Sequence, residues 1–167
     1  MKFISWSFIL KKSLIFFFFF ANITLQAQNT YLFPVQKSGN WGMLTKKGRM
    51  AIPAKFDKVQ NIFKGFYVLV KKDNKFGLYN QKGEQILAPT HEQIRVLDKD
   101  MIIFSEAGKW GLHSNGMNVF PPNLEEITRL NSSFVRIKQD QKYGVADLNG
   151  ELVIVPEMDT IYIADTQ

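Results

Sequence analysis

The sequence predicts an all-β protein built from four tandem antiparallel β-meanders in an open, twisted array. A fixed repeat period is the first observation. An aromatic residue followed by glycine recurs at intervals of 35, 34 and 33 residues, as Trp41-Gly42, Phe76-Gly77, Trp110-Gly111 and Tyr143-Gly144. Such a period is the signature of a repeat architecture. Valine, isoleucine, phenylalanine and tyrosine fill the intervening stretches, and these residues favour strands. Each copy also carries a second glycine and then a proline, which separate short strands.

Each copy opens with an apolar stretch that predicts its first strand, at residues 31–35, 66–70, 101–104 and 134–137. A polar turn follows and ends just before the aromatic residue, at Asn40, Lys75, Lys109 or Lys142. The second strand begins there. We expect the aromatic residue to fill the core, because stacked repeats require one large ring at the same phase of every copy. The glycine beside it would let a neighbouring backbone approach closely.

The second glycine marks a hairpin turn, after which the third strand ends at a proline. Asn115-Gly116 and Asn149-Gly150 suit tight hairpins, since both residue types tolerate positive φ. The prolines are Pro53, Pro89, Pro121-Pro122 and Pro156. A proline costs least at a strand end, where its missing N–H is not needed.

Every copy closes with an acidic residue shortly before a branched apolar residue. These closing segments are Asp57-Lys58-Val59, Glu92-Gln93-Ile94, Glu126-Ile127 and Asp159-Thr160-Ile161. We expect each segment to form a fourth strand that pairs with the next copy, and its carboxylate to cap a turn. The repeats then span about residues 31–59, 66–94, 101–127 and 134–161.

Two other architectures have a similar period. Helical-hairpin repeats are excluded, because two glycines and a proline in each copy would break both helices. A small four-bladed propeller is the alternative, since four copies could close into a ring. The unit is short beside the roughly 40–45 residues of a propeller blade, which favours the open array. One copy cannot bury its apolar side alone, so the copies must stack.

Residues 1–27 have the pattern of a secretory signal peptide. Lys2, Lys11 and Lys12 precede an apolar run, and Ala27 is a plausible last residue before cleavage. A retained membrane anchor is the alternative, but a span needs about 20 apolar residues and the two adjacent lysines interrupt this one. We therefore expect residues 28–167 to form a single exported domain without a transmembrane segment, located in the periplasm, on the cell surface or beyond.

The chain contains no cysteine, which excludes disulfides, lipid attachment at a cysteine and catalysis by a thiol. Residues 28–167 hold 18 basic and 15 acidic side chains, a balance too mild for a nucleic-acid-binding protein. The charges are unevenly spread. Residues 28–83 hold 11 basic and 2 acidic side chains, whereas residues 84–167 hold 7 and 13.

This charge asymmetry predicts that the basic half faces an anionic polysaccharide, lipid headgroups or an acidic partner protein. The residues expected to make that contact are Lys46, Lys47, Arg49, Lys55, Lys58, Lys71, Lys72 and Lys75.

The chemistry of an enzyme is not evident in the sequence. His91 and His113 are the only histidines and lie in different copies, so no metal or cofactor site is expected. Glu125 and Glu126 are adjacent, and on a strand they would point to opposite faces. A non-catalytic protein-interaction module is therefore the first interpretation. A glycan-binding module that uses exposed aromatics, such as Tyr67, Tyr79 and Tyr162, is the second, and an unrecognised envelope enzyme is the third.

The aromatic-glycine motifs resemble the WG (KWG) repeat family of bacterial proteins. The resemblance rests on Asn40-Trp41-Gly42, Lys75-Phe76-Gly77, Lys109-Trp110-Gly111 and Lys142-Tyr143-Gly144, each followed by a strand, a glycine turn and a proline. It covers roughly residues 31–163. Phe76 and Tyr143 depart from the family's tryptophan, and the third copy diverges most. The resemblance implies a β-rich repeat array, commonly in exported or envelope-associated proteins, and implies no reaction.

Overall fold

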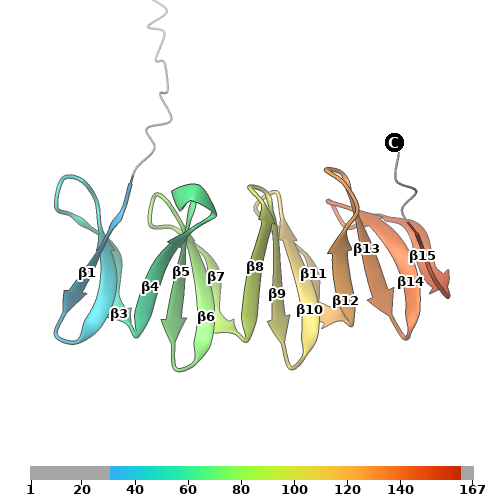
Figure 1. Cartoon of the computed structure of the whole chain (residues 1–167), viewed down its shortest axis with the longest axis horizontal. Coiled ribbons are helices and arrows are strands. Elements are labelled where there is room, and N and C mark those ends of the chain that lie inside the picture. The colour runs from blue at the N-terminus through green and yellow to red at the C-terminus, as the bar shows by residue number, and fades with distance from the viewer. Residues whose placement is uncertain (1–30, 163–167) are drawn as a thin grey trace, which may run out of the picture.

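The computed structural model describes residues 31–162, which form antiparallel sheets standing in a row. The first sheet and the last lie at opposite ends of the molecule (Figure 1). The predicted open array of β-meanders is therefore confirmed, and the closed propeller is wrong, because the terminal sheets do not meet. The predicted signal peptide, residues 1–27, lies outside the described residues. Within residues 31–162, no helix is long and apolar enough to cross a membrane.

The four sheets follow one another along the chain. The first contains β1 (Phe33–Lys37), β2 (Asn40–Leu44) and β3 (Met50–Phe56). The second contains β4 (Lys58–Ile62), β5 (Tyr67–Lys72), β6 (Lys75–Asn80) and β7 (Gln85–His91), with a 3-10 turn at Phe63–Gly65 after β4. The third contains β8 (Gln93–Asp98), β9 (Met101–Glu106), β10 (Lys109–Ser114) and β11 (Met117–Leu124). The fourth contains β12 (Glu126–Arg129), β13 (Phe134–Gln139), β14 (Lys142–Asp147) and β15 (Leu152–Met158).

The chain passes from one sheet to the next through a single acidic residue. Asp57 separates β3 from β4, Glu92 separates β7 from β8, and Glu125 separates β11 from β12. The closing strand then pairs with the first strand of the next repeat, so Val59 lies opposite Val70. The same pairing joins β8 to β9 and β12 to β13. The predicted fourth strand is confirmed for the first three repeats, whereas residues 159–161 of the last repeat form no strand. The corner acid of the third repeat is Glu125 rather than Glu126.

Neighbouring sheets bury each other's apolar faces. Successive residues of a strand point to opposite sides, so a middle sheet presents two apolar faces. In the second sheet, Val68 and Val70 pack into the cluster shared with the first sheet. Leu78 packs into the cluster shared with the third sheet, against Ile102 and Phe104. A last cluster fills the space between the third and fourth sheets. Each fully buried side chain of this size contributes about 1.5–3 kcal/mol.

The glycine after each aromatic residue lies against a bulge in the third strand of its sheet. Phe76 pairs with His91 and Leu78 with Leu87, so residues 88–90 lie opposite Gly77 alone. The other sheets show the same register shift. A Cβ added to Gly77 would lie 2.8 Å from the backbone nitrogen of Pro89. This collision with backbone explains why glycine follows every aromatic residue, as the sequence predicted.

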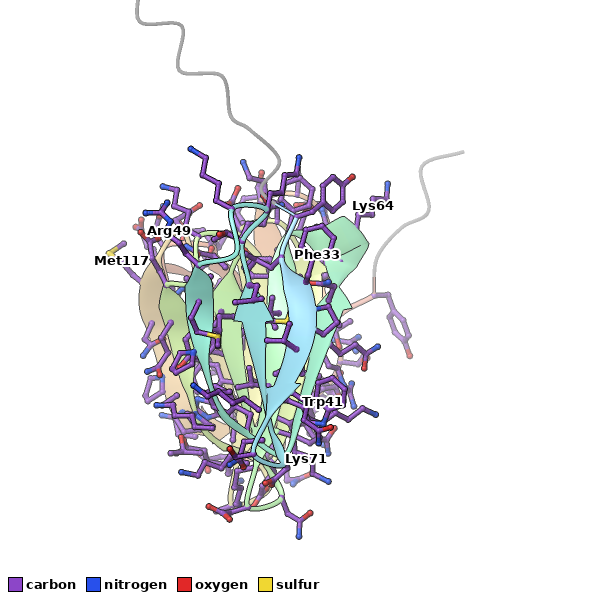
Figure 2. The ribbon with its side chains drawn as sticks, turned by 90° about the vertical axis from the view of Figure 1, so that its left-hand side faces the viewer. Phe33, Trp41, Arg49, Lys64, Lys71 and Met117 are labelled. Carbon is purple, nitrogen blue, oxygen red and sulfur yellow. The ribbon has the colours of Figure 1, made fainter. Side chains whose placement is uncertain are left out.

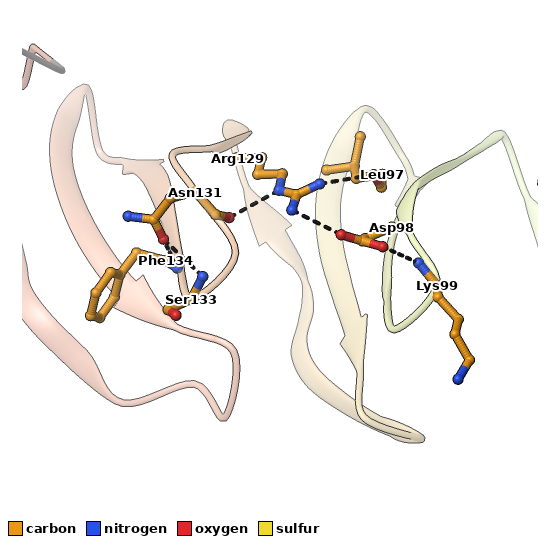
Figure 3. A network of polar contacts seen from close by, with 7 residues as sticks. All are labelled: Leu97, Asp98, Lys99, Arg129, Asn131, Ser133 and Phe134. Atoms are coloured by element: carbon orange, nitrogen blue, oxygen red, sulfur yellow. Dashed lines mark hydrogen bonds and ion pairs between the residues drawn. The ribbon is translucent and has the colours of Figure 1, made fainter. Parts of the chain in front are cut away.

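Arg129 provides a polar link between the third and fourth sheets (Figure 3). Its Nη2 lies 2.8 Å from Oδ2 of Asp98, and its Nη1 donates to the carbonyl oxygen of Leu97 at 3.2 Å. Its Nε donates to the carbonyl oxygen of Asn131 in the loop after β12. The Asn131 side chain in turn accepts from the backbone N–H groups of Ser133 and Phe134. Arg129 therefore ties the end of β8 to the loop that leads into β13.

Substituting Gly77→Ala should destabilise the protein by about 1–3 kcal/mol, because the added methyl group must displace the β7 backbone. Urea unfolding followed by circular dichroism would measure this loss. Lys82→Ala, at an exposed position of the same repeat, should change stability by less than about 0.5 kcal/mol. Equal stability of the Gly77→Ala variant and the wild type would show that the bulge is not held against the glycine.

Candidate functional site

The corner carboxylates, which are Asp57, Glu92 and Glu125, fix the first hairpin of the following repeat. Oδ2 of Asp57 accepts from the Asp73 N–H at 2.8 Å, and Oε2 of Glu92 accepts from the Gly108 N–H at 3.1 Å. Oε2 of Glu125 accepts from the side-chain amide of Gln141 at 2.9 Å. Asp57 and Glu92 therefore cap turns, as the sequence predicted, whereas Glu126 and Asp159 bind side chains instead.

The lysine before the aromatic residue pairs with the acid that closes its own repeat. Nζ of Lys75 lies 3.4 Å from Oε1 of Glu92, and Nζ of Lys109 lies 3.8 Å from Oε1 of Glu125. The Gly108 N–H, followed by Lys75, lowers the pKa of the Glu92 carboxyl below its usual value. Lys75 was predicted to contact an anionic surface, but its position at this corner gives it a structural role.

The repeated aromatic residues lie at the side of the array rather than in its interior. Trp41, Phe76, Trp110 and Tyr143 are all half-buried. Only Trp110 packs against one of the interior clusters. The prediction that these rings fill the core is therefore wrong. The interior position comes two residues later, where Met43, Leu78 and Leu112 are fully buried. The glycines between them, Gly42, Gly77, Gly111 and Gly144, are buried against the bulges.

Cations cover three of these four rings. Nζ of Lys71 lies 5.8 Å from the centre of the Phe76 ring, and the Arg95 guanidinium lies 4.6 Å from that of Trp110. Arg136 and Lys138 both lie over Tyr143. Each such contact at an exposed site is worth about 0.5–1 kcal/mol. The rings thus act as platforms that hold basic side chains at the side of the array.

A shallow depression at the junction of the second and third sheets collects three basic side chains, of which Lys71 and Arg95 also cover rings. We call it the basic groove. Two adjoining concavities form it and share Leu69 and Phe76 as lining residues. Its lining includes Lys58, Leu69, Lys71, Phe76, Ile94 and Arg95. An apolar floor with cationic edges can bind an anion that also carries an apolar body.

The structure divides the basic residues predicted from the sequence into separate groups. Lys58 and Lys71 lie in the basic groove. Lys46, Lys47 and Arg49 lie in the loop between β2 and β3, and Figure 2 shows Arg49 near the opposite end of the strands from Lys71. Lys55 lies over Phe56, and Lys72 is exposed at the end of β5. The predicted set therefore does not form one surface.

Arg95 is a groove residue that the sequence analysis missed. It belongs to the acidic half of the chain, so the charge balance of that half does not point to a basic contact there. Its position relative to the corner acid could have identified it as a residue of the junction. It follows the corner acid by three residues, as Gln60 and Thr128 do in other copies. Strand β8 brings it across the junction to the ring of Phe76.

The tyrosines proposed as exposed contacts lie in different surroundings. Tyr79 is buried in the cluster between the first two sheets, so its predicted exposure is wrong. Tyr67 is half-buried, and its hydroxyl donates to the carbonyl oxygen of Lys99. Burial raises the pKa of both phenols. Tyr162 is exposed, as predicted.

Both histidines are buried in separate sheets. Nδ1 of His91 lies 2.9 Å from Oε1 of Glu106, and its ring packs on Phe104. Burial lowers the pKa of His91, with Glu106 opposing that shift. Nδ1 of His113 lies 2.9 Å from Oδ1 of Asn118. Within residues 31–162, no three His, Asp or Glu side chains converge as metal ligands would.

A family model described as a WG containing repeat matches the chain three times, over residues 41–76, 76–110 and 112–143. These matches run from one aromatic-glycine motif to the next and so share the period of the sheets. No curated protein matches the chain.

Substituting Glu92→Gln should flatten the dependence of stability on pH below about pH 4.5. Because the folded state lowers the pKa of Glu92, its carboxylate adds stability above the unfolded pKa. That contribution is lost as the pH falls through the folded pKa. Urea unfolding at a series of pH values would measure it. Glu157→Gln, at an exposed carboxylate, is the control and should keep the wild-type slope. Identical slopes for all three proteins would contradict the capping account.

Proposed function

The chain belongs to the WG repeat family, and from this premise we propose that it is an exported, non-catalytic module that binds an acidic segment of a partner protein in the basic groove. The family supports the β-repeat array, while the groove supports the choice of partner. The charged pattern of residues 1–27 supports export to the periplasm, the cell surface or beyond.

The observation that carries this proposal is the lack of neutralising partners for the three cations of the groove. Among the described residues, no ion pair is recorded for Lys58, Lys71 or Arg95. The outer side of the fourth sheet differs, because Arg136, which takes the place of Leu69 in that sheet, lies 2.9 Å from Oε1 of Glu126. A groove that holds three unneutralised cations attracts carboxylates and also steers their approach.

Glycan binding has less support. Tyr79 is buried and cannot present its ring to a sugar. The Tyr67 hydroxyl is already bound within the array. The floor of the basic groove is formed by Leu69, Phe76 and Ile94. This apolar floor suits the methylene groups of a glutamate side chain, whose carboxylate would reach a cation at the edge.

The proposal predicts that poly-L-glutamate binds residues 28–167 and that the groove cations determine the affinity. Tryptophan fluorescence would follow the titration, since Trp110 lies under Arg95. Replacing Lys58, Lys71 and Arg95 together with glutamine should weaken binding about tenfold or more, a loss of at least about 1.4 kcal/mol. Raising the salt concentration should weaken wild-type binding as well.

The matched control replaces Lys46, Lys47 and Arg49 with glutamine. It removes the same charge from the loop at the other end of the strands, and its affinity should stay near that of the wild type. Equal losses in both variants would show that net charge rather than the groove attracts the polymer. Binding of polygalacturonate in preference to poly-L-glutamate would favour an acidic glycan instead.

A further inference from the structure

The first and last sheets expose the two halves of the interface that joins every pair of neighbouring sheets inside the array. We propose that a second copy of this chain docks there head to tail, so that the rear face of one copy covers the front face of the next. The front face is the outer side of β1–β3, and the rear face is the outer side of β13–β15 (Figure 1). This proposal is independent of the basic groove.

The rear face exposes positions that are buried in earlier repeats. Ile154 pairs with Val145, as Ile52 pairs with Met43 in the first sheet. Ile52 is fully buried against the second sheet, whereas Ile154 is 38% exposed. Met158 occupies the place of Phe56 and is exposed as well. The rear face is therefore an interior interface with one side uncovered.

The front face supplies the matching side. Phe33 precedes the aromatic residue of its repeat by eight positions, as Val68 does in the second repeat. Val68 is 1% exposed because the first sheet covers it, whereas Phe33 is 50% exposed. Leu44 likewise takes the place of the buried Tyr79 and is only half-buried. A rear face placed against these residues would reproduce the packing between the first two sheets.

The strand pairing also continues across this junction. Each inner first strand, such as β5, pairs with the closing strand of the preceding repeat. Among residues 31–162, no strand pairs with the outer edge of β1. Asp159, Thr160 and Ile161 are the closing segment of the last repeat, and no next repeat within the described residues receives it. Docking would add this segment to β1, with Asp159 near the turn at Ser38, as Asp57 lies at Asp73. Pro34 in β1 lacks an N–H group, so the pairing between β1 and the docked segment would lose at most one backbone hydrogen bond.

Charge favours the same arrangement. Residues 28–56 carry five basic side chains and no acidic one. Residues 134–162, which span β13–β15 and the closing segment, carry five acidic side chains and three basic ones. Docking of two equivalent ends would bring like charges together, whereas head-to-tail docking brings opposite charges together.

Two of the hairpin glycines, Gly83 and Gly150, contact the preceding sheet. A Cβ on Gly83 would lie 2.4 Å from the Ala51 carbonyl oxygen, and one on Gly150 would lie 2.8 Å from Cγ1 of Val119. Gly83 and Gly150 thus press against the preceding sheet, whereas Gly116 of the third repeat has open space around it. The equivalent Gly48 has open space around it, and Val153, which occupies the place of Ala51 and Val119, is 57% exposed. In the docked pair, Gly48 of one copy would rest on Val153 of the other.

Sedimentation velocity of residues 28–167, which contain every described strand, tests this proposal over a range of concentrations. The wild type should form dimers and longer chains as concentration rises, because a head-to-tail contact does not close on itself. Phe33→Asp on the front face or Val153→Asp on the rear face should each weaken association at least about tenfold. Met117→Asp replaces an exposed apolar residue away from both faces and should leave association unchanged.

A mixture of the two end variants gives the sharpest result. Phe33→Asp keeps an intact rear face and Val153→Asp keeps an intact front face, so together they should form a dimer that grows no further. Circular dichroism would show that both variants fold. A wild type that stays monomeric at every concentration would overturn the proposal. Association that persists in both variants would also overturn it. So would association that only one of the two substitutions abolishes, because one face would then bind the same face of a second copy.

Discussion

A single sheet of this array cannot shield both of its apolar faces from water, and the rest of the structure follows from that constraint. The alternation of side chains along each strand places apolar residues on both sides of the middle sheets. Each middle sheet must therefore lie between two others. The corner carboxylates stabilise this arrangement. A single acidic residue connects one sheet to the next, and Asp57 and Glu92 also cap the first hairpin of the following sheet. The apolar contacts and the chain path thus specify the same arrangement.

Close packing between sheets also determines where variation is tolerated. The interior positions and the glycines at the bulges are fixed by contact with backbone and with neighbouring side chains. The side of the array is freer. Lys71 has Gln36, Ser105 and Lys138 as its counterparts, and Arg95 has Gln60 and Thr128. The basic groove is consequently a property of one junction, although the backbone that carries it is repeated.

The sequence predicted the features that local signals determine. The period, the hairpin turns, the closing strand and the close approach at each glycine all depend on residue types at fixed spacing. The burial of Trp41 and its counterparts could not be predicted in this way. A ring that repeats at one phase can point into an interface or lie along its edge, and both choices give the same period. The burial of Tyr79 was missed because the residue type at its position varies between repeats. Leu44, His113 and Ala146 occupy that position in the other copies, so no repeated residue marked it as part of the core.

The basic residues show a second limit of sequence reasoning. Arg49 and Lys58 are near neighbours in the chain, but β3 carries the chain along the full length of a strand between them. Arg95 is distant in sequence, yet the corner at Glu92 brings β8 beside the ring of Phe76. Proximity across a junction depends on the stacking of sheets, and only the three-dimensional arrangement reveals it.

Amide hydrogen exchange of an isolated second sheet, residues 57–92, tests the dependence of each sheet on its neighbours most directly. In the intact array, the amides of β5 and β6 should be protected, because both faces of that sheet are covered. The account predicts that the same amides in the isolated segment exchange at the rate of an unfolded chain. Protection of β5 and β6 in the isolated segment would contradict it, since the sheet would then be stable without a neighbour.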